Sequence, residues 1–126
     1  MELSTLRANP TAEVELIHPL EGPTGVFITL ASRDHPDVRA VASGIADKRL
    51  AMLSRRGGKA PKFEDMEAES LQVLLASVQG WRGIVVEGEP WPCTPENIRT
   101  LLGGNDSWIR RQLNAAQEDE ALFFEK

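Results

Sequence analysis

Hydrophobic and polar residues alternate near the start of the chain in the manner of β-strands. Two apolar runs, 14–18 and 26–30, flank a loop that is rich in proline and glycine. In the second run every second residue is a branched aliphatic one, namely Val26, Ile28 and Leu30. This period of two is typical of a half-buried strand. The pattern predicts an antiparallel hairpin, which must pack on helices because an isolated hairpin is only marginally stable.

Longer apolar periodicities follow and predict two long helices. Over 34–53 the apolar residues recur every three or four positions, which predicts a buried helical stripe made of Val38, Ala42, Ile45, Ala46, Leu50 and Leu53. Asp34 can cap this helix, and Gly44 indicates a middle that is either weak or closely packed. A second helix is predicted over 64–79, with Gly80 as its stop and a stripe made of Leu71, Leu74, Leu75 and Val78.

The segment 80–97 combines glycine, proline and tryptophan, and it predicts a small hairpin that leads directly into a helix. The β-branched run 84–86 favours a strand, and Gly88 suits the turn after it because glycine readily takes a positive φ. Thr94 is followed by a proline and an acid, which together form a strong helix start. The side chains expected to pack this connector are Trp81 and Trp91.

Two shorter helices complete the predicted fold. One should span 94–102, and the next should begin at Asn105 or Asp106 with an apolar face made of Ile109, Leu113 and Ala116. The expected class is α+β and mostly helical, with two longer and two or three shorter helices and one or two small antiparallel hairpins. A chain of 126 residues is typical of one domain, which is predicted over 14–126 after a flexible N-terminal arm, 1–13.

The composition and the reactive residues of the chain argue against several classes of function. The chain carries 14 basic and 19 acidic residues, a net charge of −5 that argues against binding to nucleic acid. No apolar run approaches the ~20 residues that span a bilayer, so no membrane association is expected. Cys93, His18 and His35 form no pattern of metal ligands or of an activated nucleophile. The expectation is therefore a non-enzymatic protein without cofactor or metal, with a thiol-dependent role for Cys93 as an alternative.

A flexible basic loop is predicted over 54–63, where Arg55 and Arg56 are candidate accessory contacts to a partner. The Gly-Lys pair in this loop does not form a phosphate-binding Walker loop. That motif needs an earlier glycine and a following hydroxyl, whereas Leu53 and Ala60 occupy these two places. A solvated loop is the expected structure, and a surface for an anionic partner is the alternative.

Aromatic residues late in the sequence are the main candidates for partner contact. Leu122, Phe123 and Phe124 either fold back onto the domain or present apolar surface to a partner. Trp108, with Ile109 beside it, raises the same question at the start of a helix, because an aromatic side chain there can be core or an interface anchor. The residues alone leave both readings open.

The order of these motifs resembles a known family. The stretch GWRGIVVEGEPWPCTPENIRTLL, followed by WIRRQLNAAQEDEALFF, is similar to the tail assembly chaperones of long-tailed bacteriophages and prophages. In that family a Gly-Trp-x-Gly start, a hydrophobic strand, a glycine turn, a Thr-Pro-Glu-Asn helix start and a late Phe-Phe recur in this order. The chain from Val14 to about Leu53 fits the same pattern, whereas Cys93 stands where the family pattern has phenylalanine.

The resemblance implies a non-enzymatic assembly chaperone with a helix-rich fold. Such a protein binds the tape measure protein, keeps it soluble, helps recruit tail tube subunits in the host cytoplasm, and is not expected in the mature virion. The resemblance tilts Trp108 and the run Leu122, Phe123 and Phe124 toward partner contact. Three questions stay open: whether the chain self-associates, whether it is instead a structural or head–tail joining component of the virion, and whether it is a small thiol-dependent enzyme or inhibitor.

Overall fold

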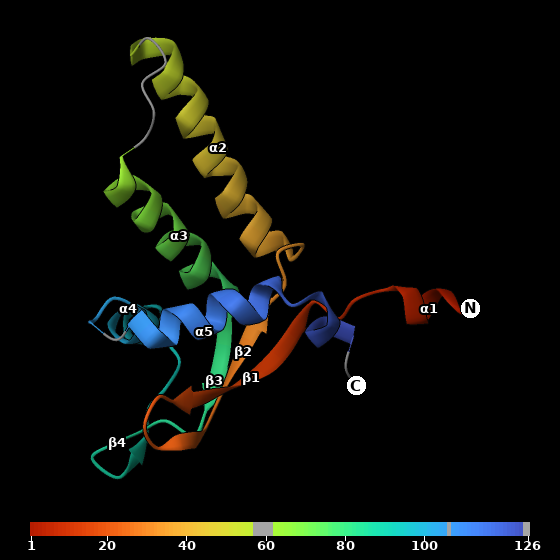
Figure 1. Cartoon of the computed structure of the whole chain (residues 1–126), viewed down its shortest axis with the longest axis vertical. Coiled ribbons are helices and arrows are strands. Elements are labelled where there is room, and N and C mark those ends of the chain that lie inside the picture. The colour runs from red at the N-terminus through yellow and green to blue at the C-terminus, as the bar shows by residue number, and fades with distance from the viewer. Residues whose placement is uncertain (57–61, 106, 125–126) are drawn as a thin grey trace.

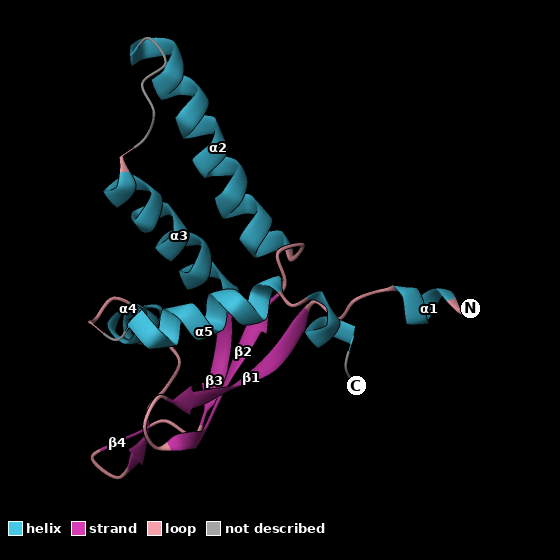
Figure 2. Cartoon of the chain, viewed as in Figure 1, coloured by secondary structure: helices cyan, strands magenta, loops and turns pink. Residues whose placement is uncertain are grey.

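A computed structural model describes residues 1–56, 62–105 and 107–124 of the chain (Figure 1). In chain order the elements are α1 (Leu3–Leu6), β1 (Thr11–His18), β2 (Gly22–Ala31), α2 (Pro36–Arg56), α3 (Phe63–Ser77), β3 (Val78–Arg82), β4 (Val85–Val86), β5 (Glu89–Pro90), α4 (Pro95–Leu102), α5 (Ser107–Glu118) and the 3-10 helix η1 (Glu120–Phe124). Helices dominate, and the strands form one three-stranded and one two-stranded antiparallel sheet (Figure 2). The predicted α+β class, mostly helical, is confirmed.

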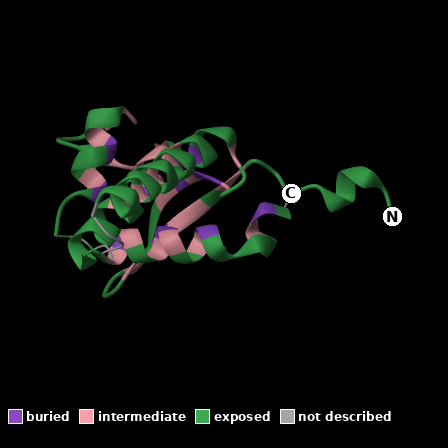
Figure 3. Ribbon diagram, turned by 90° about the horizontal axis from the view of Figure 1, so that it is seen from above, coloured by how far each residue is buried: buried purple, intermediate pink, exposed green. Residues whose placement is uncertain are grey.

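The larger sheet is built on the predicted hairpin of β1 and β2, and its strand order is β1-β2-β3. The hairpin is longer than the apolar runs indicate, because Thr11 already pairs with Ala31 at one end and His18 with Gly22 at the other. Strand β1 therefore includes the last three residues of the predicted arm. The remaining arm carries α1, which is exposed throughout and lies apart from the rest of the chain (Figure 3).

Strand β3 corrects the predicted end of the second long helix. Helix α3 ends at Ser77, and Val78 opens a strand that runs antiparallel to β2. Gly80 is not the helix stop, because it lies inside this strand opposite Thr29. The backbone groups along the free edge of β2 need hydrogen-bond partners, and a strand supplies them whereas a longer α3 would not. This tertiary pairing overrides the local helical pattern.

The core lies between the larger sheet and the helices α3, α4 and α5. The inward residues of β2 alternate as predicted, and Ile28 and Leu30 are completely buried. Nine residues form the central cluster, and they are Leu16, Ile28, Leu30, Leu74, Val78, Ile98, Leu102, Ile109 and Leu113. The predicted faces of α3 and α5 thus point inward. Their flanking members are half-buried, namely Leu71, Leu75 and Ala116.

Helix α2 differs from its prediction along most of its length. Of the predicted stripe only Val38 is buried, Ile45 is half-buried, and the other four members are exposed, namely Ala42, Ala46, Leu50 and Leu53. Figure 1 shows the physical reason, since α2 and α3 form a hairpin that projects away from the sheet. The outer half of α2 consequently has no core to cover it, and the periodicity alone could not reveal that.

The two ends of α2 also differ from the prediction. The capping group is His35 and not Asp34, because the Asp37 backbone N–H donates to His35 Nδ1 over 3.1 Å. At the other end the helix continues through Ser54 to Arg56. The rest of the predicted basic loop, 57–61, lies outside the described residues.

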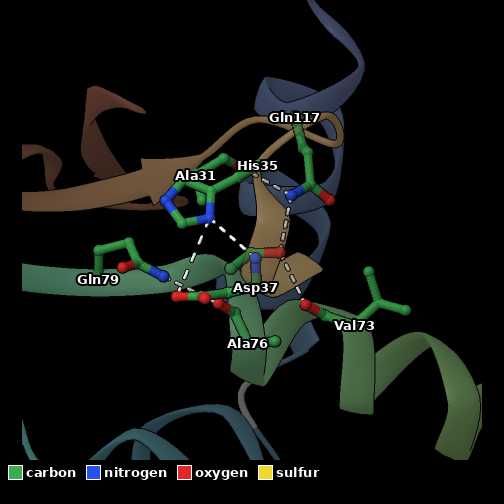
Figure 4. A network of polar contacts seen from close by, with 8 residues as sticks. Ala31, His35, Asp37, Val73, Ala76, Gln79 and Gln117 are labelled. Carbon is green, nitrogen blue, oxygen red and sulfur yellow. Dashed lines mark hydrogen bonds and ion pairs between the residues drawn. The ribbon is translucent and has the colours of Figure 1, made fainter. Parts of the chain in front are cut away.

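A buried polar network joins α3, α5 and β2 (Figure 4). Gln117 Nε2 donates to the carbonyl of Ala31 at 2.9 Å and to the hydroxyl of Ser77 at 2.7 Å. That hydroxyl donates in turn to the carbonyl of Val73. Gln117 and Ser77 are both buried, so the polar residues at the end of α5 are not all solvated. Satisfied buried polar groups of this kind hold neighbouring elements in one arrangement.

The connector between β3 and α4 matches its prediction closely. Strands β4 and β5 form the small hairpin, and positive φ values of 51° at Glu87 and 82° at Gly88 give it a tight primed turn. Trp81 and Trp91 stack with centroids 5.2 Å apart, and the Trp81 indole donates to the Trp91 carbonyl. Thr94 Oγ1 accepts from the Asn97 backbone N–H at 3.1 Å, which confirms the predicted cap of α4.

Candidate partner-binding surfaces

A groove of about 610 Å³ opens between α2, α3 and the start of α4. Its walls are mainly aliphatic, and the side chains that form them include Val41, Ile45, Leu75 and Ile98. The charged residues of the lining are Lys48 on α2 and Arg99 on α4, and the lining includes no acidic residue. A concave apolar surface with a few polar groups at its margin is typical of a binding site.

Gly44 lies in the α2 wall of this groove and explains part of its width. A Cβ atom built on Gly44 would have nothing within 4 Å. The closely packed alternative for the middle of α2 is therefore wrong, because this glycine faces open space. In the free chain Gly44 serves no packing need, although it weakens the helix relative to alanine.

Large apolar side chains are also exposed at the far end of the α2–α3 hairpin. We call these five residues the apolar tip, and they are Leu50, Met52, Leu53, Phe63 and Met66. Phe63 is 73% exposed and Leu50 is 65% exposed, values that leave most of their apolar surface in water. Exposed apolar surface gathered at one place is typical of sites that contact other proteins.

The structure buries part of the predicted aromatic site. Ile109 is 6% exposed and belongs to the core cluster, and Phe123 is 4% exposed. The backbone N–H of Asn9 donates to the carbonyl of Phe123 over 2.6 Å, so η1 folds back against the start of β1. Leu122 is half-buried, whereas Phe124 remains 47% exposed. The aromatic end is thus divided, with Phe123 directed inward and Phe124 left at the surface.

Trp108 is half-buried against the core cluster, beside a shallow hollow of about 430 Å³. Its indole meets the His18 imidazole edge to face, with centroids 5.3 Å apart. His18 ends β1 as predicted, and its Nδ1 accepts the backbone N–H groups of Leu20 and Glu21. Gln112 completes this corner by bonding both backbone groups of Ile17 at the sheet edge. These contacts explain Trp108 as packing at the end of the hairpin.

The two predicted arginines lie far from these aromatic residues. Arg55 is exposed in the last turn of α2, and Arg56 ends the helix, although its side chain lies outside the described part of the structure. Figure 1 places this end of α2 and the C-terminus at opposite sides of the chain. The predicted partner-contact residues therefore do not form one surface.

The cysteine and histidine side chains that could carry catalytic chemistry take part in packing and helix capping. Cys93 is half-buried against the core cluster, and burial raises the pKa of its thiol. A raised pKa lowers the thiolate fraction at neutral pH, which opposes a nucleophilic role. His35 caps α2 as described above. Within the described ranges, no group of three or more potential ligand residues could hold a metal ion.

The sequence pattern predicts neither the groove nor the apolar tip. One signal for them exists in α2, where the apolar residues cover a wide sector of the helix instead of a narrow stripe. Ile45 and Leu50 are five positions apart, which places them well apart around the axis at about 100° per residue. A helix that is apolar on several sides must be covered on several sides or leave apolar surface exposed.

Comparison with models of known protein families, with curated proteins and with solved structures finds no match for this chain. Among the residues that the structure describes, no helix has both the length and the apolar character needed to cross a membrane.

Proposed function

We propose that this protein is a non-enzymatic phage tail assembly chaperone that binds apolar helical segments of the tape measure protein. In this role it keeps the tape measure protein soluble in the host cytoplasm, helps recruit tail tube subunits, and leaves before the virion is complete. The resemblance of the motifs motivates the choice of partner. The observation that carries the proposal is the α2–α3 hairpin, which exposes the apolar tip and forms two walls of the apolar groove.

Apolar surface on a projecting hairpin suits a protein that shields another chain. Covering such surface is favourable by roughly 25 cal/mol for each Å² removed from water, whichever apolar sequence covers it. A groove between helices can accept the apolar face of a partner helix, which is a recurrent mode of recognition. The net charge of −5 supports solubility of the resulting complex, because like-charged complexes repel one another.

Co-expression with the tape measure protein encoded in the same genome tests this function. We expect the soluble yield of the tape measure protein to rise and the two chains to purify together. A variant with Leu50→Ser and Phe63→Ser should lose most of this effect, because both side chains belong to the exposed tip. Cys93→Ser is the matched control and should retain it. Absence of a complex and of any gain in solubility for the unmodified chain would contradict the proposal.

Mass spectrometry of purified phage particles supplies a second, independent test. An assembly chaperone should be missing from finished particles, whereas a structural or head–tail joining component should be present in a fixed copy number. Detection of the chain in washed particles at a stoichiometry comparable to that of tail proteins would replace the proposed role with a structural one.

A further inference from the structure

We infer that the groove between α2, α3 and α4 is a docking site for an amphipathic partner helix whose apolar stripe is flanked by acidic residues. This inference deepens the proposed function, on which it rests, by naming the surface and the kind of segment bound. Three observations carry it: the apolar walls, the sign of the charges at the groove, and the open space at Gly44.

The walls of the groove come from three separate elements and offer aliphatic contacts. Val41 and Ile45 belong to α2, Leu75 to α3 and Ile98 to α4. A helix lying between these walls would bury apolar residues that recur every three or four positions. An extended peptide would instead need a free sheet edge beside it to pair its backbone, and the groove is lined mainly by helices.

The basic residues of the groove lining favour partner helices whose apolar stripe is flanked by acidic residues. The chain as a whole is acidic, with a net charge of −5, yet the charged residues of the groove lining are the basic Lys48 and Arg99. Neither side chain has an ion-pair partner among the residues that the structure describes. Carboxylates beside the apolar stripe of a partner would meet these two cations, whereas a stripe flanked by lysine would be repelled.

The side of α2 that lines the groove continues beyond it toward the apolar tip, where Met52 is exposed. Val41, Ile45, Lys48 and Met52 follow one another at spacings of four, three and four residues, so they lie on one side of the helix. From the first to the last of them, at about 1.5 Å per residue, the surface extends roughly 16 Å, which matches about three turns of a bound helix. Gly44 lies within this length and lets the partner approach the α2 backbone closely.

Gly44→Leu is the decisive variant. The added side chain meets nothing within 4 Å at its Cβ, so the free chain should keep its fold, while the leucine fills the space that the partner needs. Ser43→Leu is the matched control, because Ser43 is exposed and lies on the opposite side of α2 from Val41 and Ile45. Circular dichroism and the melting temperature confirm that both variants are folded.

Two synthetic helical peptides serve as probes, with one shared leucine stripe flanked either by glutamate or by lysine. In fluorescence anisotropy we expect the glutamate peptide to bind at least tenfold more tightly than the lysine peptide. Gly44→Leu should weaken binding at least tenfold, and Ser43→Leu should leave it unchanged. The double variant Lys48→Glu and Arg99→Glu should reverse the preference between the two peptides.

Several results would overturn the inference. These are no binding of either peptide, equal binding by the Gly44→Leu variant, or a preference that survives the double charge reversal. A fourth is self-association in sedimentation that Gly44→Leu abolishes without any peptide binding, which would make a second copy the occupant.

Co-expression with the tape measure protein tests the proposed function independently of the peptide titration. If the unmodified chain and the Gly44→Leu variant solubilise the tape measure protein equally well, the proposed chaperone function is supported. The groove is then not the surface that binds the tape measure protein. If the unmodified chain fails to solubilise it, the function falls, and the peptide titration still decides whether the groove binds an acidic helix.

Discussion

Helices α5 and α2 both carry apolar residues at helical spacing, yet only α5 buries them. In α5 the residues Ile109 and Leu113 belong to the core cluster, and Gln117 adds a buried polar contact one turn further. In α2, which is almost twice as long, Val38 is the buried member of the predicted stripe. The periodicity of a sequence therefore reports which face of a helix is apolar, but not whether the protein itself covers that face.

Position in the fold explains the difference between the two helices. Helix α5 lies across the larger sheet, and both β1 and β2 contact it (Figure 1). Helix α2 packs mainly on α3, and Arg49 on α2 forms an ion pair with Glu69 on α3 at 2.8 Å. The larger sheet, α4 and α5 form the body of the protein, which is thus held together mainly by apolar burial. The projecting hairpin keeps apolar surface in water, which is the cost expected at a binding surface.

The largest expected effect separates the body from the hairpin directly. Leu113 is completely buried, so Leu113→Ala should lower the free energy of unfolding by about 2–5 kcal/mol, because it removes apolar contacts and leaves a cavity. Leu50→Ala, at a residue that is 65% exposed, should change it by no more than about 0.5 kcal/mol. Urea denaturation measures both. A comparable loss at Leu50 would mean that the hairpin is buried in solution, for example by self-association.

A second expected effect comes from the polar network of the body. Gln117→Leu should destabilise the protein by about 1–3 kcal/mol, because the buried carbonyl of Ala31 loses its donor from Gln117. Gln79→Leu is the control, since Gln79 is exposed and its hydrogen bond to the carbonyl of Ala76 is exposed to solvent. Chemical denaturation compares the two variants. Equal stability of the Gln117 variant and the unmodified protein would show that water or a rearranged side chain replaces the lost bonds.

Two glycines, one in the projecting helix α2 and one in the β4–β5 turn, should have opposite effects on stability when they are replaced by alanine. Gly44→Ala should raise the free energy of unfolding by about 0.5–1 kcal/mol, because alanine is the better helix former and its Cβ meets nothing. Gly88→Ala should lower it by roughly 1–2 kcal/mol, since φ is 82° at this turn position. Thermal unfolding should shift in opposite directions for the two variants. A destabilising Gly44→Ala change would mean that the groove is tighter than described.

Local signals predicted the elements whose chemistry is local. Thr94 caps α4 through its own hydroxyl, and Gly88 takes the positive φ of its turn, so each follows from residues near it in sequence. The end of α3 could not be found in this way. Val78 suits a helical stripe as well as a strand, and only the pairing of β3 with β2 decides between them.

The candidate site was less predictable than the fold, because its parts are distant in sequence. Ile45 on α2 and Ile98 on α4 line one groove although more than fifty positions separate them. Of the predicted partner contacts, Phe123 is buried because η1 returns to the start of β1, a fold-back that the residues alone left open. Local periodicity carries no information about such long-range contacts.

The smallest expected effect lies on the outer face of the sheet. The Arg82 guanidinium donates two hydrogen bonds to the Glu13 carboxylate and stacks over the Phe27 ring at 3.9 Å, so these side chains join β1, β2 and β3. The hydrogen bond from Arg82 is the main reason why the pKa of Glu13 lies below its ordinary value of 4.5. A carboxyl group with a lowered pKa in the folded state stabilises the fold above its unfolded pKa, and this contribution is lost as the pH falls through the folded pKa.

Arg82→Gln should return the pKa of Glu13 toward 4.5, because it removes the hydrogen bond and the charge that lower it. An NMR titration of the Glu13 side-chain carboxyl carbon measures this shift. Arg33→Gln is the control, since Arg33 pairs with Glu118 and should leave the pKa of Glu13 unchanged. The acid limb of the stability curve should flatten only slightly in the Arg82 variant, because an exposed ion pair is screened by solvent. An unmoved pKa would show that the Glu13–Arg82 pair is not formed in solution, and the sheet would then depend on its backbone pairing and buried face alone.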